Sequence, residues 1–262
     1  MTQPSLHVSF NETVCTLEMC LPQRGNPINR ALVDEMNQAL DLCEQGASIV
    51  VLQGCDGVFS MGADFQLMEQ QTKTGSLDRH SPECLYALWQ RLACGPFISV
   101  CHLQGRANAG GVGFVAACDL VFADETARIS LSELLFDITP ACVLPFLVRK
   151  VGYQQAHYLT LTTQPIEVEQ AKWMGLVDDY AARSHELLRK HLLRLRRLSK
   201  TGISQYKHYM NQLNPLIFTA QAQAIALNHQ IFQNPDTLAR IVHFIESGQI
   251  SRDPQRPSLM DP

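Results

Sequence analysis

The sequence has 262 residues, a net charge of −4 and a hydrophobic content of 46%, which is enough to fill the core of a large globular domain. This mild acidity gives no general reason to expect a nucleic acid or an anionic membrane surface as partner. The start of the sequence lacks a basic region followed by an apolar run, and no apolar stretch reaches the length of a membrane span. We therefore expect a cytoplasmic protein.

Nine cysteines are scattered along the chain without a CxxC pair, mostly among apolar residues. This pattern favours buried reduced thiols over disulfides or metal ligands, so we predict no metal site.

Strands and helices alternate in the first part of the chain, which predicts an α/β fold. Asn29 is placed to cap the first helix, which runs to about Glu44. Residues 58–67 are predicted to be a strand that breaks at Gly62 and restarts as a helix, followed by a polar loop over 70–80. The other strands expected here are 6–10, 14–19, 48–53 and 96–102, and a further helix spans 81–94.

The stretch 102–120, HLQGRANAGGVGFVAACDL, is predicted to end a buried strand, turn at 109–111 and begin a thin helix at about Gly111. A helix start without covering side chains presents free N–H donors and the positive end of a dipole. Small residues are also expected wherever a helix packs closely, so the glycine pair alone is a weak signal.

Helices dominate the rest of the chain. A strand at 119–123 and the run 127–136 come first. Later, from about Glu186 to Gly248, the chain is predicted to be helical, with breaks expected at Gly202 and at 214–215. The intervening helices are expected at 140–151 with Pro145 inside, 153–161 and 168–174.

Two glycine-containing breaks, at 61–64 and 109–111, each follow an apolar strand and precede a helix. Two parallel strands ending side by side would aim the amides of Ala63 and Gly110 at one point. Such a pair is an oxyanion hole suited to a thioester carbonyl.

These motifs resemble the crotonase, or enoyl-CoA hydratase/isomerase, superfamily, in family order and spacing over about the first 180 residues. The resemblance implies an α/β spiral of β-β-α units (1–195) with a helical C-terminal trimerisation region (196–262), assembled as a homotrimer or hexamer. The motifs that carry it are VVLQG, FSMGADF, NAGGVGFVAACDLVFA, ARISLSE and QAKWMGLVD.

The resemblance also implies roles for single positions. Ala63 and Gly110 supply the oxyanion-hole amides for a thioester on a phosphopantetheine arm, with no bound cofactor. Of the two glutamates of family hydratases, the first falls at Gly113, which has no side chain, and the second at Glu133. A single carboxylate can still move a proton beside the thioester. Ala141 stands where dienoyl isomerases carry an aspartate, so that chemistry loses support.

A closer resemblance spans nearly the whole chain, to the dehydratase of the polyketide β-branching cassette. It implies removal of water from 3-hydroxy-3-methylglutaryl on an acyl carrier protein to give 3-methylglutaconyl. Glu133 would take the C2 proton and return it to the departing hydroxyl. The stretches that carry this resemblance are LSELLF, PACVLPFLVRKVGYQQAHYLTLTTQPI and LLRKHLLRLRRLSKTGISQYKHYMNQL.

Two further groups of residues are candidates. Asn108, Tyr86 and His80 are weaker candidates for the substrate pocket. A basic run, RKHLLRLRRLSK, is either a solvated helix face or a docking face for an acidic carrier protein. Its cations are Arg189, Arg194, Arg196, Arg197 and Lys200.

Three alternatives stay open at this point. The chain could be an enoyl-CoA isomerase or hydratase, the decarboxylating sister enzyme of the same cassette, or a carrier- or nucleic-acid-binding crotonase-like protein with a vestigial site. Retention of Glu133 with both hole positions argues against a vestigial site.

Overall fold

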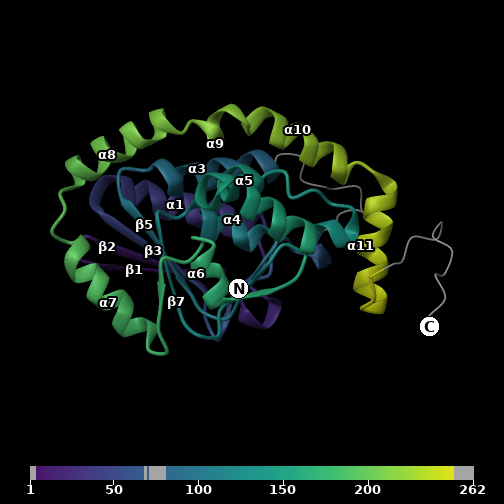
Figure 1. The fold of residues 1–262 in the computed structure, drawn as a ribbon, viewed down its shortest axis with the longest axis horizontal. Coiled ribbons are helices and arrows are strands. Elements are labelled where there is room, and N and C mark those ends of the chain that lie inside the picture. The colour runs from purple at the N-terminus through teal and green to yellow at the C-terminus, as the bar shows by residue number, and fades with distance from the viewer. Residues whose placement is uncertain (1–3, 68–69, 71–80, 251–262) are drawn as a thin grey trace.

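The computed structural model describes residues 4–67, 70 and 81–250, which build two sheets surrounded by helices (Figure 1). The six-stranded sheet has the order β1-β2-β3-β5-β7-β10 and the four-stranded sheet the order β4-β6-β8-β9. The first comprises β1 (Leu6–Asn11), β2 (Val14–Met19), β3 (Ile49–Gln53), β5 (Ile98–Leu103), β7 (Leu120–Ala123) and β10 (Asp179–Tyr180); the second comprises β4 (Val58–Ser60), β6 (Arg106–Asn108), β8 (Arg128–Ser130) and β9 (Ile166–Glu167).

The helices cover both faces of the larger sheet and extend beyond it. They are α1 (Arg30–Gly46), α3 (Ser81–Cys94), α4 (Gly110–Ala117), α5 (Leu144–Thr162), α6 (Val168–Trp173), α7 (Ser184–Leu195), α8 (Lys200–Leu213), α9 (Leu216–Thr219), α10 (Gln221–Phe232) and α11 (Pro235–Ser247), with short 3-10 helices η1 (Pro22–Arg24) and η2 (Glu133–Phe136).

The central strands of the larger sheet, such as β3 and β5, are buried on both faces, as their apolar sequences predict. Val50 and Leu52 of β3 belong to the main core with α1, α3 and α4. The alternate residues, Ile49 and Val51, belong to a second core with α7 and α8. The period-two alternation of β3 therefore assigns the N-terminal helices to one face and α7 with α8 to the other.

The smaller sheet places β4 and β6 side by side and parallel, in the arrangement that the two glycine-containing breaks suggest. Gly62, just after β4, has a φ of +92°, and a Cβ there would lie 2.9 Å from the Ala109 Cβ and 3.2 Å from the Gly110 nitrogen. Only glycine fits this conformation and this approach. The chain segments after β4 and β6 are thereby held against each other.

The structure corrects two helix boundaries. Gly202 is not a break: the chain leaves α7 at 196–199, and the Ser199 hydroxyl oxygen caps α8 by accepting the Gly202 N–H at 3.1 Å. A glycine in the first turn costs little because the cap stabilises that turn. Pro145 does not lie inside a helix that starts at residue 140, because α5 begins at Leu144 and places Pro145 in its first turn, where no N–H is needed.

Other expected features agree with the structure. The Asn29 side chain caps α1 by accepting the Leu32 N–H at 3.1 Å. The chain breaks at Asn214 and Pro215, and α5 kinks at Gly152, whose φ is +78°. Helices α8, α9 and α10 form one arc over α3 and α5, which places α7 and α11 at opposite ends of the molecule (Figure 1).

Candidate active site

A cavity of about 690 Å³ lies where the chain leaves β4, β6 and β8, and α10 and α11 also contribute to its wall. Four of the candidate site residues predicted from the sequence line it: Ala63, Asn108, Gly110 and Glu133. They come from three separate segments, so the parallel pairing of β4, β6 and β8 brings them together.

Two backbone amides on the cavity wall lack acceptors. The Ile28 N–H donates to the Gly62 carbonyl oxygen at 2.8 Å and the Asp64 N–H to the Ile28 carbonyl oxygen at 3.3 Å, so this pairing leaves the N–H of Ala63 unused. Gly110 is the first residue of α4, whose cap Ala109 offers no side-chain acceptor. Across residues 4–67, 70 and 81–250, nothing accepts the N–H of Ala63 or Gly110. Both donors are therefore available to a ligand.

Ala109 adopts a backbone conformation that is strained for a residue with a Cβ, with φ +50° and ψ −124°. Hydrogen bonds on both sides hold it there: its N–H donates to the Ser130 carbonyl oxygen at 3.1 Å, and its carbonyl oxygen accepts the Val112 N–H at 2.9 Å. The turn that presents the Gly110 amide is thus fixed before any ligand binds.

Glu133 begins η2, three positions after the last residue of β8, Ser130. Its Oε2 is buried and lacks a hydrogen-bond partner within the described part of the chain. Burial raises the pKa of Glu133 to about 7, because an ionised carboxylate is poorly stabilised away from water. A carboxyl group with this pKa can both accept and donate a proton near neutral pH.

Asn108 supports the segment that carries Glu133. Its amide nitrogen donates to the Ser132 hydroxyl at 2.9 Å, and its amide oxygen accepts the Ser130 hydroxyl at 2.8 Å. Asn108 is therefore a positioning residue beside the cavity rather than a proton donor.

The other two pocket candidates do not join this group. Tyr86 is fully buried but does not line the cavity, and its hydroxyl donates to the Ile217 carbonyl oxygen at 2.8 Å. Burial raises the pKa of Tyr86, so its hydroxyl stays protonated and serves packing. His80 lies outside the described residues.

Some polar and aromatic residues of the cavity wall could not be anticipated from the sequence. His229 on α10 lines the cavity, and its Nε2 lies 2.7 Å from Glu83 Oε1 on α3. Trp89 of α3 lines the cavity as well. Both helices show only an ordinary amphipathic pattern, so nothing local in the sequence distinguishes these residues from core or surface positions.

The basic run does not reach this cavity. Arg196 pairs with Glu12 at 2.8 Å, and the Lys200 ammonium donates to the Cys43 and Ala47 carbonyl oxygens at the end of α1. Arg189, Arg194 and Arg197 are exposed on or just beyond α7.

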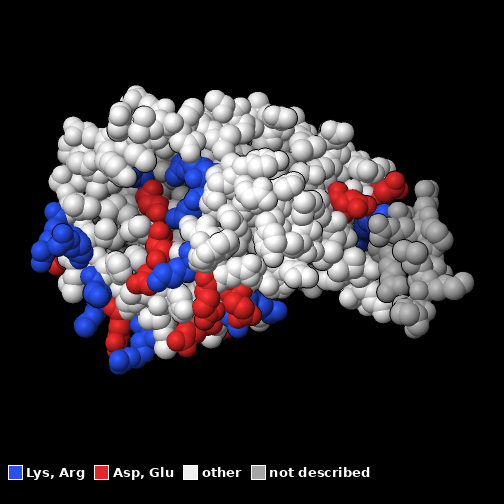
Figure 2. Space-filling view, viewed as in Figure 1, with Lys and Arg blue, Asp and Glu red and all other residues white. Residues whose placement is uncertain are grey.

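Helix α7 packs on the face of the large sheet away from α4 and the cavity. Figure 2 shows the blue side chains at the α7 end mixed with red ones. Within one chain the large sheet separates this run from the cavity, and two of its five cations, Arg196 and Lys200, are held by structural partners.

Within the described residues, no cluster of three or more His, Cys, Asp or Glu side chains is arranged to hold a metal ion. None of the helices that the structure describes is long and apolar enough to cross a membrane.

Two free amides and a buried carboxylate on one cavity, placed by parallel strands, define the class of protein. The enoyl-CoA hydratase/isomerase family model matches residues 9–250, and the chain belongs to that family. It is an enzyme of the hydro-lyase type with the crotonase fold.

Individual proteins are similar to this chain to different extents. The bacillaene synthase dehydratase PksH of Bacillus subtilis is 45% identical over 256 residues, which cover 97% of this chain and 99% of PksH. The crystal structure of pksH has a TM-score of 0.92 and covers 95% of this chain and 100% of its own. An enoyl-CoA hydratase/isomerase from Xanthobacter autotrophicus Py2 has a TM-score of 0.82 at 19% identity, a likeness of fold alone.

Proposed function

We propose that the chain is a polyketide-pathway dehydratase that converts 3-hydroxy-3-methylglutaryl thioester on an acyl carrier protein to 3-methylglutaconyl thioester. The observation that carries this proposal is the buried carboxyl group of Glu133, with its pKa near 7, on the same cavity as the free amides of Ala63 and Gly110. The 45% identity with a dehydratase of bacillaene synthase over nearly the whole chain supports it.

The first step forms an enolate. The thioester oxygen accepts hydrogen bonds from the amides of Ala63 and Gly110, which stabilise the negative charge as it develops. Ionised Glu133 removes a proton from C2, and the electron pair of the C–H bond moves toward the thioester oxygen.

The second step expels the hydroxyl group. The enolate electrons form the C2–C3 double bond while the C3–O bond breaks, and protonated Glu133 gives its proton to the departing oxygen. Water leaves and Glu133 returns to its ionised state, so one carboxyl group completes the cycle. A pKa near 7 suits both transfers, because neither protonation state is strongly favoured at neutral pH.

The intact mass of the carrier protein separates this reaction from its alternatives. After incubation with the carrier-bound 3-hydroxy-3-methylglutaryl thioester, we expect loss of one water. Loss of carbon dioxide from 3-methylglutaconyl carrier protein would instead identify the decarboxylating sister enzyme. An unchanged mass, with hydration of simple enoyl-CoA, would identify an ordinary hydratase.

The pH dependence of the free energy of unfolding should reveal the burial of Glu133 independently of activity. The ordinary pKa of a glutamate is 4.5 and that of folded Glu133 about 7, so the folded protein holds this proton more tightly than the unfolded chain. The resulting stabilisation is complete below about pH 4.5 and is lost as the pH rises through about 7.

Glu133→Gln should therefore raise the free energy of unfolding at about pH 8 and change it little at about pH 4. Urea titrations at the two pH values measure this difference. An equal change at both would contradict the buried, high-pKa assignment.

We propose that the chain assembles as a homotrimer or a pair of trimers through α8 and α9. Exposed apolar side chains gather there, and Figure 2 shows an uncharged upper surface over these helices. Replacing Tyr209 and Leu213 with glutamate should lower the mass found by sedimentation to that of one chain; an unchanged mass would place the contact elsewhere. The exposed set is Tyr206, Tyr209, Met210, Leu213 and Phe218.

A further inference from the structure

Position 113 on α4 is closed to any side chain. A Cβ added to Gly113 would lie 2.4 Å from Cζ2, 2.6 Å from Cη2 and 2.7 Å from Cε2 of Trp89. The six-membered part of the indole therefore fills the space into which a residue at 113 would project. The resemblance to family hydratases places their first glutamate at this position.

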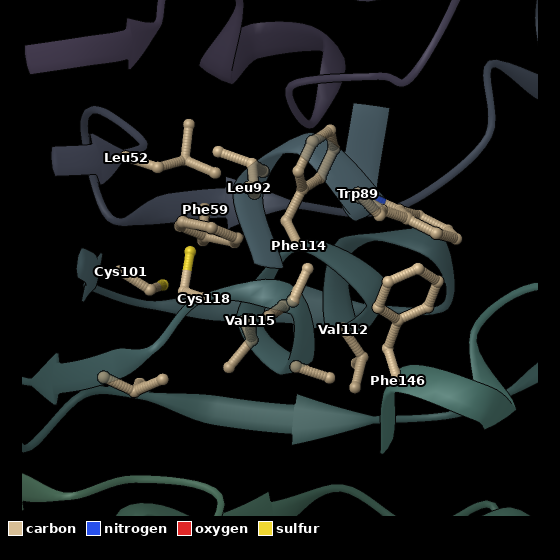
Figure 3. Packing of buried hydrophobic residues seen from close by; sticks show 14 of the residues in the cluster. Leu52, Phe59, Trp89, Leu92, Cys101, Val112, Phe114, Val115, Cys118 and Phe146 are labelled. Carbon is tan, nitrogen blue, oxygen red and sulfur yellow. The ribbon is translucent and has the colours of Figure 1, made fainter. Parts of the chain in front are cut away.

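Trp89 is held firmly in that space. It is 1% exposed, and its ring packs edge-on against Phe114 at a centroid distance of 5.8 Å and against Phe146 at 5.7 Å. Figure 3 shows the indole close to both of these rings. Its placement is set by the core and does not depend on a ligand.

The same indole also forms part of the cavity wall. Gly113 follows Gly110 by three positions, so the two share one face of α4 and lie about 5 to 6 Å apart. If the Gly110 amide binds the thioester oxygen, the indole lies beside the acyl carbons that follow the thioester.

The indole also carries a polar atom without a partner in the described part of the chain. Its Nε1 is buried and lacks a hydrogen-bond partner among residues 4–67, 70 and 81–250. A buried indole N–H ordinarily has an acceptor.

We propose that Trp89 is a specificity-determining residue that contacts the acyl group, with its indole packed against C3 and the methyl branch. The indole would then occupy the space that the first glutamate of family hydratases, at position 113, would fill. This inference rests on the proposed function, because that function supplies the branched acyl group. Glycine at 113 is then the partner that lets the indole reach the cavity.

Fluorescence tests the contact without requiring turnover. The chain has two tryptophans, and Trp173 is 77% exposed on α6 outside the cavity lining. In a Trp173→Phe variant the emission reports Trp89 alone. The probes are pantetheine thioesters of 3-methylglutarate, which has no hydroxyl to lose, and of acetate, which lacks C3.

We expect a saturable change in emission with the 3-methylglutaryl thioester and a smaller one with the acetyl thioester. Calorimetric titration of the same samples confirms that each thioester binds. Equal emission responses to the two bound thioesters, or none to either, would overturn the contact.

Substitution tests the packing and the specificity together. Gly113→Ala should destabilise the wild-type fold through its clash with Trp89 but should be neutral or stabilising in a Trp89→Leu background, because alanine is the better helix former. Trp89→Leu should also reduce the preference for the 3-methylated over the unmethylated 3-hydroxyglutaryl carrier substrate by about tenfold in kcat/KM, the scale for one methyl group in an apolar pocket. Trp89→Phe, which keeps a ring, should reduce it less.

Equal losses of kcat/KM on both substrates would show that Trp89 serves folding alone. If the wild-type enzyme turned over neither substrate, the proposed function would fail, whereas the emission response and the stability coupling between 89 and 113 would still decide the role of Trp89.

Discussion

Glu133→Gln is expected to lower the rate of dehydration by about 10²- to 10⁴-fold, the usual contribution of a general base that acts at the reacting carbon. Glutamine keeps the shape of the side chain but cannot accept the C2 proton. Steady-state kcat for the carrier-bound substrate measures the loss. In the proposed mechanism Glu133 is both the base and the acid. An added buffer acid replaces only the second role and should therefore not restore the rate.

A matched control for this substitution is Glu169→Gln. Glu169 lies in the first turn of α6, is exposed and does not line the cavity. This variant should keep the wild-type rate. Dehydration by the Glu133→Gln variant at the rate of the control would remove Glu133 from the mechanism.

Ala63→Pro should lower kcat by about 10²- to 10³-fold, because it removes one of the two amide donors that, in the proposed mechanism, stabilise the enolate oxygen. The surrounding segment is anchored independently of that N–H by the bond between Asp64 and Ile28 and by the Arg24–Asp64 ion pair at 2.7 Å. Thermal unfolding followed by circular dichroism checks that the fold survives.

Ala63→Gly retains the donor and is the control for this pair. We expect its kcat to stay within a few-fold of wild type. A folded proline variant with the kcat of the glycine variant would show that the Ala63 amide does not stabilise the transition state.

Much of the fold could be predicted because local patterns and tertiary packing agree. The apolar run 49–52 of β3 and the capped α1 each carry their own signal in the sequence. The approach of Gly62 to Gly110 was predictable too, because each glycine break directly follows an apolar strand and parallel strands of one sheet end at the same edge.

The errors in helix boundaries arose because the cost of a glycine or proline depends on its place in the helix. Gly202 looks like a break and Pro145 looks like a residue inside a helix that starts at 140, yet each lies in a first helical turn where its cost is small. The partners of Lys200 and Arg196 also lie more than a hundred residues earlier in the chain, so the sequence of the basic run gives no sign of them.

The residues of the candidate site also differ in how far the sequence predicts them. Ala63, Gly110 and Glu133 sit within local motifs, so their positions could be anticipated. Trp89 and His229 reach the cavity from helices whose sequences give no such sign. The sequence shows at Gly113 only that a glutamate is missing. It does not show that the Trp89 indole fills this space, because Trp89 lies on another helix.

A structure of the protein with a bound 3-methylglutaryl thioester tests the central claim most directly. We predict one thioester oxygen at about 2.7 to 3.1 Å from the amide nitrogens of both Ala63 and Gly110, with the Glu133 carboxyl group against C2. A thioester oxygen bound away from both amides, or a C2 carbon out of reach of Glu133, would contradict it.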